Sequence, residues 1–285
     1  MTNQHAGRLD PLAPDPVALA ALAEAAAREA GALLLAERDR VRAALPSMPN
    51  DIDLTASAQA MNPFTETDRA CEELIARRIL EVRPRDGFVA EEGTSRDGGP
   101  VQWIVDPIDG TANYLRGIPH FSVSIAADVS GTVVAGVVYS PLVDELFRAA
   151  RGAGATLNGG AIRVSPEARL SHAVVATGLG NPGDANVVRQ HLRRLHNVLP
   201  VIADVRRTGS AALDLCWVAC GRVDAYYEAG QFPWDIAAGD LIVREAGGRS
   251  EAITRNVPLS EQTWLAANPV LFDPLRDLLT TSAPV

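Results

Sequence analysis

The stretch 103-WIVDPIDGTANYLRG-117 decides how this chain is interpreted, because it places acidic side chains directly after an apolar run. The apolar start predicts the end of a buried strand. Asp106 and Asp109 follow at once, and Gly110 and Thr111 come next. Two carboxylates this close repel each other. A divalent cation that prefers oxygen ligands, such as Mg²⁺, would relieve that repulsion.

The residues after the second aspartate suggest a partner for such a cation. Gly110 lets the backbone approach a ligand closely, and a helix that starts at Thr111 would offer its first N–H groups to an anion. Carboxylates beside such donors suit a phosphate ester that is bound together with metal ions. This arrangement would also explain how a chain with a formal net charge of −9 can hold an anionic substrate.

Composition narrows the possible functions. The 285 residues are 47% hydrophobic, and the acidic balance argues against binding to nucleic acid or to anionic membranes. All 26 basic residues are arginine, which excludes a lysine nucleophile, a Schiff base and a Walker P-loop. No apolar run has the length of a membrane span, and residues 1–14 predict a flexible tail rather than a secretory signal. The three cysteines predict a reduced, cytoplasmic protein.

Hydrophobic periodicity predicts a different organisation in each half of the chain. Up to about residue 170 we expect helices over 16–42 and 66–82, and strands over 101–105, 122–129, 132–141, 145–152 and 154–160. From about residue 171 we expect strands over 173–177, 201–205, 223–227 and 263–267, alternating with helices over 185–197, 210–220 and 235–247. The first half is therefore α+β and the second α/β, and together they predict a single domain over residues 15–285.

Three further stretches place acidic residues where a strand ends or a helix begins. They are 65-TETD-68, 89-VAEEG-93 and 234-WDIAAGDLIVREAGG-248. Taken alone, Asp235 is equally well explained as an ordinary cap, because the helix dipole stabilises a carboxylate there by about 0.3–1 kcal/mol. The two glutamates of the second stretch, taken alone, predict a solvated loop.

Several blocks of the sequence resemble the signature blocks of the inositol monophosphatase family, a group of Mg²⁺-dependent, lithium-sensitive phosphatases. The strongest are 91-EE-92, 106-DPIDGTANYLRGIPHFSVSIA-126 and 234-WDIAAGDLIVREAGG-248. The supporting stretches are 65-TETDRACEEL-74, 207-RTGSAALDL-215 and 224-DAYYEAGQFPWD-235, in the family's order. The resemblance covers roughly residues 16–280. It is specific because the blocks that begin at Asp106 (DPIDGT) and at Trp234 (WDIAAG) occur together.

The resemblance implies the layered αβαβα sandwich of the sugar phosphatase superfamily, a homodimer, and two to three bound Mg²⁺ ions. The implied metal ligands are Glu91, Asp106, the Ile108 carbonyl, Asp109 and Asp235. The implied catalytic residues are Glu91, Thr111 and Asp106, with Glu91 and the Thr111 hydroxyl orienting a metal-activated water that attacks phosphorus.

The resemblance also implies a set of substrate contacts. The backbone N–H groups of Gly110 and Thr111 would bind the phosphate. Ser210, Ala211 and Glu228 would face the alcohol, and Asp68 would belong to the outer polar shell. One feature departs from the family, which often carries a lysine shortly before the segment matching 62-NPFTETD-68. Here Ser57 is the nearest counterpart by spacing. The missing lysine affects the expectation of a third metal site, but not the core ligands.

One rival signal is the formal G-x-G-x-x-G at 178-GLGNPG-183, between an expected strand and an expected helix, with Asp204 about twenty residues on. It keeps a dinucleotide-binding oxidoreductase open, although a glycine-rich loop near the substrate entrance is the favoured interpretation. The histidines show no metal-binding spacing, and His120 is expected to be structural. Cys216 and Cys220 predict core positions on a helix. The basic cluster 189-RQHLRRLH-196 predicts a solvated helix face or a contact with a partner.

The sequence therefore predicts a Mg²⁺-dependent phosphomonoesterase that acts on a small phosphate ester. Myo-inositol 1-phosphate is the expected substrate, and histidinol phosphate or a broader range of sugar and polyol phosphates is the alternative. A regulatory role through contact with another macromolecule also stays open.

Overall fold

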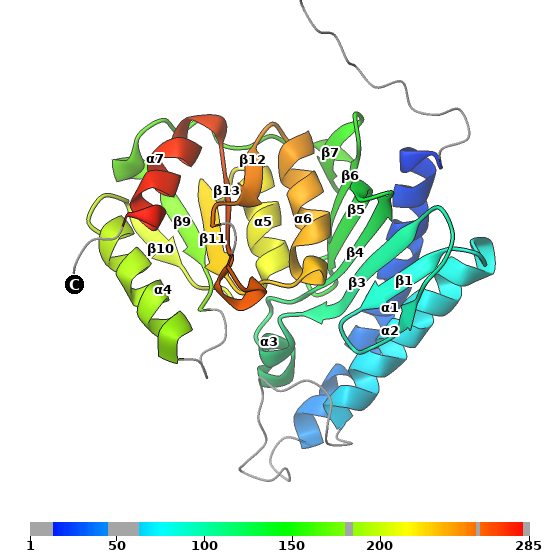
Figure 1. Cartoon of the computed structure of the whole chain (residues 1–285). Helices are drawn as coiled ribbons and strands as arrows, with labels where there is room; N and C mark the ends of the chain where they lie inside the picture. Colours follow the sequence, from blue (N-terminus) through cyan, green and yellow to red (C-terminus); the bar gives the residue numbers. More distant parts are fainter. Residues whose placement is uncertain (1–13, 45–62, 180–184, 255–256, 282–285) are drawn as a thin grey trace, which may run out of the picture.

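The computed structural model describes residues 14–44, 63–179, 185–254 and 257–281, and these form five stacked layers (Figure 1). The helices of the three helical layers are, in pairs, α1 (Pro16–Ala44) with α2 (Pro63–Val82), α5 (Ala211–Ala219) with α6 (Pro233–Glu245), and α4 (Ala185–Val198) with α7 (Pro269–Thr280). A β-sheet separates each pair from the next. The expected αβαβα sandwich is thus confirmed.

The first sheet has eight strands in the order β2-β1-β3-β4-β5-β6-β7-β8. Their bounds are β1 (Gly87–Ala90), β2 (Ser95–Arg96), β3 (Gln102–Asp109), β4 (Ser122–Val129), β5 (Thr132–Ser140), β6 (Glu145–Ala150), β7 (Gly154–Leu157) and β8 (Gly160–Ala161). Only β1 and β3 run parallel; the remaining neighbours are antiparallel. Alternate side chains such as Trp103 and Val105 join one core with α1 and α2, as expected for a sheet covered on that face.

The second sheet has five strands in the order β10-β9-β11-β13-β12. Their bounds are β9 (Val174–Thr177), β10 (Asp204–Arg206), β11 (Ala225–Ala229), β12 (Arg249–Ala252) and β13 (Thr263–Ala267). Apolar residues of α5 and α6 fill the space between the two sheets, and a further core joins the second sheet to α7 and the end of α4. Both faces of this sheet are therefore covered, which fits its apolar strands.

Most expected elements are present, with shifted ends. The helix expected from residue 66 begins at Pro63, and the strand expected to end at residue 105 continues to Asp109 as β3. Helix α7 was not expected, although it carries a clear start signal: the Asn268 side chain accepts hydrogen bonds from Val270 N and Leu271 N, each at 3.0 Å. The expected flexible tail and the loop around Ser57 fall almost wholly outside the described residues.

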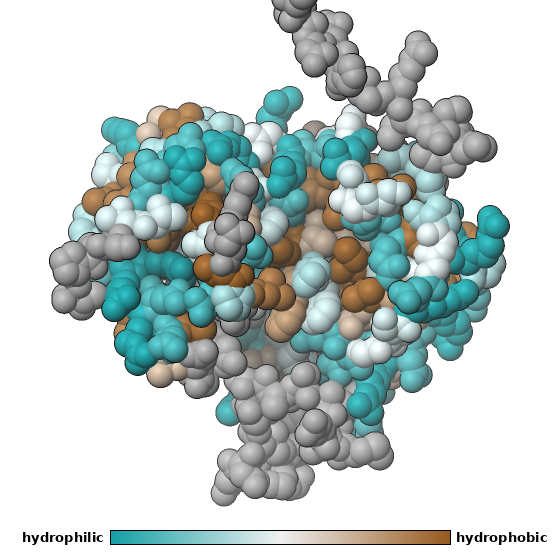
Figure 2. All heavy atoms as spheres, in the orientation of Figure 1, coloured by the Kyte–Doolittle hydropathy of each residue, from teal (hydrophilic) through white to brown (hydrophobic). Residues whose placement is uncertain are grey.

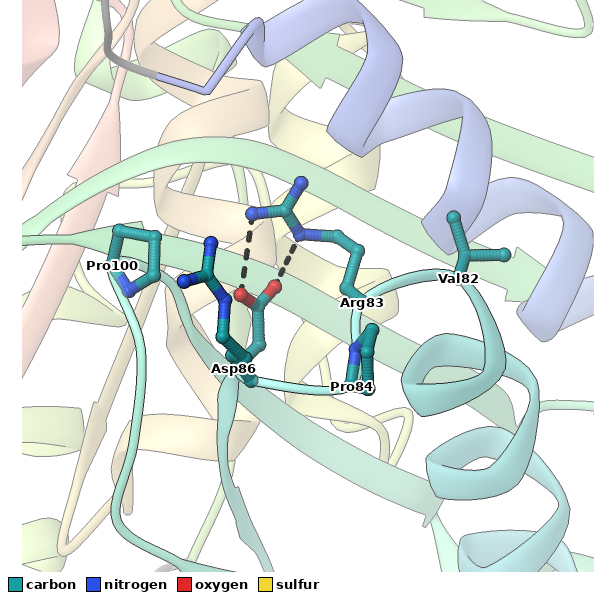
Figure 3. Close-up of a pocket in the computed structure, with 6 residues that line it drawn as sticks. Val82, Arg83, Pro84, Asp86 and Pro100 are labelled. Atoms are coloured by element: carbon teal, nitrogen blue, oxygen red, sulfur yellow. Dashed lines mark hydrogen bonds and ion pairs between the residues drawn. The ribbon is translucent and has the colours of Figure 1, made fainter.

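A small pocket of about 150 Å³ marks the junction of α2 and β1 (Figure 3). Here the Arg83 guanidinium faces the buried Asp86 carboxylate, with Arg83 Nη2 3.2 Å from Asp86 Oδ1. The Trp103 indole N–H donates to the same carboxylate at 3.0 Å. Asp86 thus joins α2 to β3 and has its charge neutralised. Among the described residues, no helix is long and apolar enough to cross a membrane.

Candidate active site

A β-bulge brings the two aspartates of the opening stretch onto one face of the sheet. Residues three apart on a regular strand point to opposite faces. In β3, however, Asp106 pairs with Ser124 and Asp109 with Ser122, so three steps on β3 match two on β4. The extra residue falls at Pro107–Ile108, where proline has no N–H to donate. Both carboxylates therefore face the layer of α5 and α6.

Four carboxylates interact at this place. Burial raises the pKa of Asp106 well above its usual range, and the charges of Glu91, Asp109 and Asp235 raise it further. Burial likewise raises the pKa of Glu91 to about 7, although a hydrogen bond shared with Asp106 acts in the opposite direction. Glu91 is brought here by β1, because its N–H donates to Val105 O of the parallel strand β3 at 3.2 Å. The four acids expected to bind metal, Glu91, Asp106, Asp109 and Asp235, thus lie in one region.

Asp109 is held by the start of α5. Its carboxylate accepts from Ala211 N at 3.2 Å, from Ala212 N at 2.9 Å, and from the Ser210 hydroxyl. Burial raises the pKa of Asp109 to about 6, while these hydrogen bonds act to lower it. Ser210 and Ala211, expected to face the alcohol of the substrate, therefore lie in the site and orient Asp109.

Asp235 is both a helix cap and a member of the acidic group. Its Oδ2 accepts from Phe232 N at 2.7 Å at the start of α6. Burial raises its pKa, and the charge of Asp109 raises it further. Ser124 is the β4 residue opposite Asp106. Its hydroxyl donates to Trp234 O at 3.2 Å and so connects the start of α6 to this sheet. The ordinary cap and the predicted ligand position are thus the same residue.

Three further acids, Asp68, Glu72 and Glu92, lie close to Glu91. Asp68 is 6% exposed, and burial raises its pKa, with further contributions from the charges of Glu92, Glu91 and Glu72. Glu72 accepts from Glu92 N and Thr94 N, each at 2.8 Å, and so fixes the turn after β1. Asp68 is therefore buried near these acids, and its place in an outer polar shell stays a prediction.

The donor set suits a hard cation. Buried oxygens of two outer acids, Asp68 Oδ1 and Glu92 Oε2, have no hydrogen-bond partner. In the part of the chain that the structure describes, no arginine forms an ion pair with any of the four interacting acids, namely Glu91, Asp106, Asp109 and Asp235. Oxygen-only donors with unbalanced negative charge are what Mg²⁺ prefers.

In this structure, however, the acidic side chains are not arranged in a metal-coordination geometry. Among the described residues, no three His, Cys, Asp or Glu side chains converge on one point closely enough to hold an ion. Asp109 directs its oxygens to α5, and Asp106 and Glu91 share a hydrogen bond. The oxygen atoms of these residues are suitable ligands for Mg²⁺. In this structure, however, the side chains form hydrogen bonds to α5 and to each other.

The turn after Asp109 contains Gly110 and Thr111, whose expected phosphate binding stays a prediction. Gly110 has φ +92°, and a Cβ there would lie 3.1 Å from both Gly209 O and His120 O, so no other residue fits without strain. Helix α3 (Thr111–Arg116) follows, and the Thr111 hydroxyl donates to Ile108 O at 2.9 Å. The Ile108 carbonyl, a predicted ligand, is therefore bound to Thr111 in this structure.

Asn113 joins this turn to the second half of the chain. Its Nδ2 donates to His120 O at 2.7 Å and to Thr208 O at 2.9 Å. The Thr208 hydroxyl in turn donates to buried Asp214 at 2.6 Å, on α5. This chain of bonds fixes the segment before Ser210 against the start of α3.

The glycine-rich loop does not have the layout of a dinucleotide-binding fingerprint. A Cβ on Gly178 would lie 1.9 Å from Glu228 Oε2, so a carboxylate fills the space where a pyrophosphate would approach. The strand expected over 201–205, with Asp204 near its end, is instead β10, which Asp204 opens; Asp204 is exposed and pairs with Arg206. The later glycines of the motif lie outside the described residues. Gly178 instead lets its chain pass close to Glu228.

The remaining candidates are structural. His120 packs edge-on against Trp217 at a ring distance of 4.9 Å, and burial lowers its pKa to about 4, so it is neutral at pH 7. Cys216 is fully buried in the core between the sheets, and half-buried Cys220 packs against the same core. Both expectations are confirmed.

The model of the inositol monophosphatase family matches residues 15–280. The chain belongs to the inositol monophosphatase family. Inositol-1-monophosphatase from Rhizobium meliloti (strain 1021) is 41% identical over 223 residues, covering 77% of this chain and 84% of the relative. Nus factor SuhB from Pasteurella multocida (strain Pm70) is 45% identical over 199 residues, covering 69% and 74%.

Solved structures agree with this membership. The native crystal structure of extragenic suppressor protein suhB from Bartonella henselae is 37% identical, with a TM-score of 0.82 over 93% of this chain and all of that one. The family acts on small phosphate esters and is generally metal-dependent. Family membership therefore supports phosphatase activity for the acidic site.

Several residues that shape the site were not predicted from the sequence. They are Glu72, Asn113, Ser122, Ser124 and Asp214. A signal existed for Glu72, because it lies one helical turn after Asp68, and for the two serines, because they alternate along one face of β4. Asn113 and Asp214 act between distant segments, and nothing in their local sequence indicates that.

Proposed function

We propose that this protein is a Mg²⁺-dependent phosphatase that hydrolyses myo-inositol 1-phosphate. The observation that carries the proposal is the group of interacting acids beside the Gly110 turn: buried Asp106 and Asp109, with partly buried Glu91 and Asp235. Burial and mutual repulsion raise the pKa of Asp106. Two to three Mg²⁺ ions, when bound, would activate a water and stabilise the leaving alkoxide.

The side chains have separable roles in this proposal. Glu91, Asp106, Asp109, Asp235 and the Ile108 carbonyl would hold the ions. Thr111 uses its hydroxyl proton on Ile108 O, so its oxygen can accept a hydrogen bond from the attacking water, which Glu91 would also orient. The N–H groups of Gly110 and Thr111 would receive the phosphate, because the absent side chain at Gly110 permits close approach.

The alcohol end of the substrate would meet Glu228. Its Oε2 accepts from the Tyr226 hydroxyl at 2.9 Å, which fixes the carboxylate on β11 beside Gly178. A fixed carboxylate accepts hydrogen bonds from the vicinal hydroxyls of a polyol. It would also attract the ammonium group of histidinol phosphate, so that ester is the alternative substrate. Contacts from Ser210 and Ala211 to the alcohol, and a homodimer, stay predictions.

Phosphate release from myo-inositol 1-phosphate and from histidinol phosphate tests the proposal. The assay uses the full chain with Mg²⁺, with EDTA in place of Mg²⁺, and with Asp106→Asn as a matched variant. Asn keeps the oxygen that accepts from Ile108 N at 2.9 Å but removes the charge. We expect Mg²⁺-dependent turnover of the inositol ester that the variant loses. Folded wild-type protein that releases phosphate from neither ester would contradict the proposal.

A role through contact with another macromolecule is a second candidate, favoured by the 45% identity to a relative named Nus factor SuhB. Genetic rescue separates the two. If Asp106→Asn restores a strain lacking this protein as well as the wild type does, contact is the role that matters. Rescue by the wild type alone would assign the role to catalysis.

A further inference from the structure

Helix α4 buries a charged residue on its inner face. Its buried residues are Val187, His191, Arg194 and Val198, a stripe at helical spacing. The stripe is apolar at its ends and basic in the middle, and Arg194 is only 9% exposed. The cluster 189-RQHLRRLH-196, expected to be a solvated face, is therefore only partly solvated.

Arg194 lines a pocket between α4 and α7. The pocket has a volume of about 230 Å³ and is lined by Gln190, Arg193, Arg194, Asn197, Thr254, Leu279, Thr280 and Thr281. Figure 2 shows the surface over α4, at the lower left, as mostly hydrophilic. Both helices cover the outer face of the five-stranded sheet, whereas α5, which holds Asp109, covers the other face (Figure 1). The pocket is thus separate from the acidic site.

The positive charge in this pocket is not neutralised by the described residues. Arg194 makes one hydrogen bond, from Nη2 to Gln190 Oε1 at 3.3 Å. Neither Arg193 nor Arg194 has an ion pair within the part of the chain that the structure describes. Tyr227 and Glu261 act on Arg194 only at longer range. None of the Arg194 nitrogens is both buried and without a partner, so its unused guanidinium donors are accessible from the pocket, where an anion can accept hydrogen bonds from them.

The end of α7 does not take up these donors. Exposed carbonyls at a helix C-terminus attract cations. Here, however, Asn197 Nδ2 donates to Leu278 O at 3.0 Å and to Thr281 O at 3.3 Å. The hydroxyls of Thr280 and Thr281 donate to carbonyls of the preceding turn. Asn197 therefore satisfies the end of α7, and the guanidinium of Arg194 stays available to a ligand.

Two other arginine-lined pockets show the opposite arrangement. In the pocket at the start of β1, Arg83 is neutralised by Asp86 (Figure 3). In a larger pocket between α1 and β6, Arg28 pairs with Glu24 and Asp144, and Arg148 pairs with Glu24. Those arginines have acidic partners inside the chain. The pocket between α4 and α7 holds cations without them.

We propose that the pocket between α4 and α7 binds a small phosphate-bearing anion through Arg194, with Arg193 at its rim. Guanidinium groups bind phosphate with paired, charge-assisted hydrogen bonds. The volume lies below the roughly 300–1,000 Å³ typical of sites for drug-sized ligands, which favours inorganic phosphate or a small phosphomonoester. This site is independent of the phosphatase activity proposed above.

Titration calorimetry on the full chain tests this proposal, with inorganic phosphate and glycerol 2-phosphate as separate probes. EDTA is present throughout, so that no metal ion recruits phosphate to the acidic site. We expect binding of at least one probe at millimolar concentration, weakened about tenfold or more in Arg194→Gln. Arg189→Gln is the matched control, because Arg189 is exposed on the same helix and bonds to Asn186. Its affinity should stay within about twofold of the wild type, well below a tenfold effect.

Arg194→Lys keeps the charge but not the paired donors, so its affinity should lie between those of the wild type and Arg194→Gln. It also serves if the glutamine variant does not fold, as judged by circular dichroism and Mg²⁺-dependent phosphate release. A preference for one probe identifies the ligand as free phosphate or a phosphoester. No binding of either probe to the wild type, or equal affinity in the wild type and Arg194→Gln, would overturn the proposal.

Discussion

The two ends of strand β1 each lead to a buried acid, Asp86 at the start and Asp106 beside Glu91 at the far end, and the two are balanced differently. At the start, Asp86 is 2% exposed, pairs with Arg83 and accepts from the Trp103 indole. At the far end, Glu91 meets Asp106, which is 1% exposed and faces further carboxylates instead of a cation. The charge of Asp86 is balanced within the chain, and the charge of Asp106 is not.

This difference separates stabilising acids from functional ones. A buried carboxylate with a cation and an indole donor stabilises its surroundings, and removing it leaves those partners unsatisfied. A buried carboxylate among other carboxylates destabilises the fold by repulsion, and is retained because a ligand offsets that cost. The two ends should therefore respond in opposite ways to mutation.

The largest expected effect follows from removing the charge of Asp106. We expect Asp106→Asn to lower kcat/KM by about a thousandfold or more, equal to about 4 kcal/mol of transition-state stabilisation. Without metal, the Asp106→Asn variant should be as stable as the wild type or more stable, because the repulsion between Asp106 and the neighbouring carboxylates is relieved. Thermal unfolding with and without Mg²⁺ checks the second part, and Mg²⁺ should raise the Tm of the wild type alone. A variant that is markedly less stable without metal would break the comparison.

Asp86 should show the reverse pattern. Asp86→Ala leaves Arg83 without its partner and buries an unsatisfied indole N–H, which should lower the free energy of unfolding by about 3 kcal/mol. Activity per folded molecule should change little, because the residue lies at the opposite end of β1 from Glu91. Urea unfolding and phosphate release measure the two quantities. A loss below about 1 kcal/mol, the range of exposed ion pairs, would show that the pair contributes no more than those do.

The turn after Asp109 offers a matched pair of glycines. Gly110 and Gly131 both have positive φ, +92° and +79°, but a Cβ on Gly131 meets nothing within 4 Å. Gly131→Ala should cost about 1 kcal/mol from backbone strain alone. Gly110→Ala should cost more, by about 1–2 kcal/mol, and should also reduce activity, because two carbonyl oxygens must move. Equal stability losses for the two variants would mean that the crowding around Gly110 relaxes freely.

A pH dependence of stability is expected at His120, outside the comparison of the two ends of β1. Its pKa is lowered by burial from 6.5 to about 4, so between these values the unfolded chain binds a proton that the folded chain does not. Its contribution to stability is complete above pH 6.5 and is lost as pH falls toward 4. The slope cannot exceed that of one proton, about 1.4 kcal/mol per pH unit.

The difference in unfolding free energy between the wild type and His120→Phe, measured across this range, isolates the His120 effect from those of the carboxylates. Phenylalanine keeps an aromatic ring beside Trp217 and cannot titrate. A difference that does not change between pH 6.5 and 4 would mean that protonated His120 is accommodated in the folded protein.

Much of the fold could be predicted from local patterns. Helix α1 starts at Pro16 as expected, and the run of strands from β4 to β7 follows from alternation and turns. The acids of the site could also be found, because the sequence pattern placed each of them near an expected strand end or helix start, although β3 in fact continues past Asp106 to Asp109. Helix α7 was missed although Asn268 and Pro269 mark its start, and the short strand β12 carries too weak a pattern.

What the sequence determined by itself was the inventory of the site: which acids exist, and which glycine turn follows them. Tertiary structure decided how they are used. The bulge at Pro107–Ile108 turns Asp106 and Asp109 to one face, because pairing with β4 skips one residue there. Asp86 is neutralised by Arg83, three residues earlier, and this pair is local. Asp106 instead meets Glu91, Asp109 and Asp235. Glu91 and Asp235 come from other segments of the chain, and local sequence does not encode that contact.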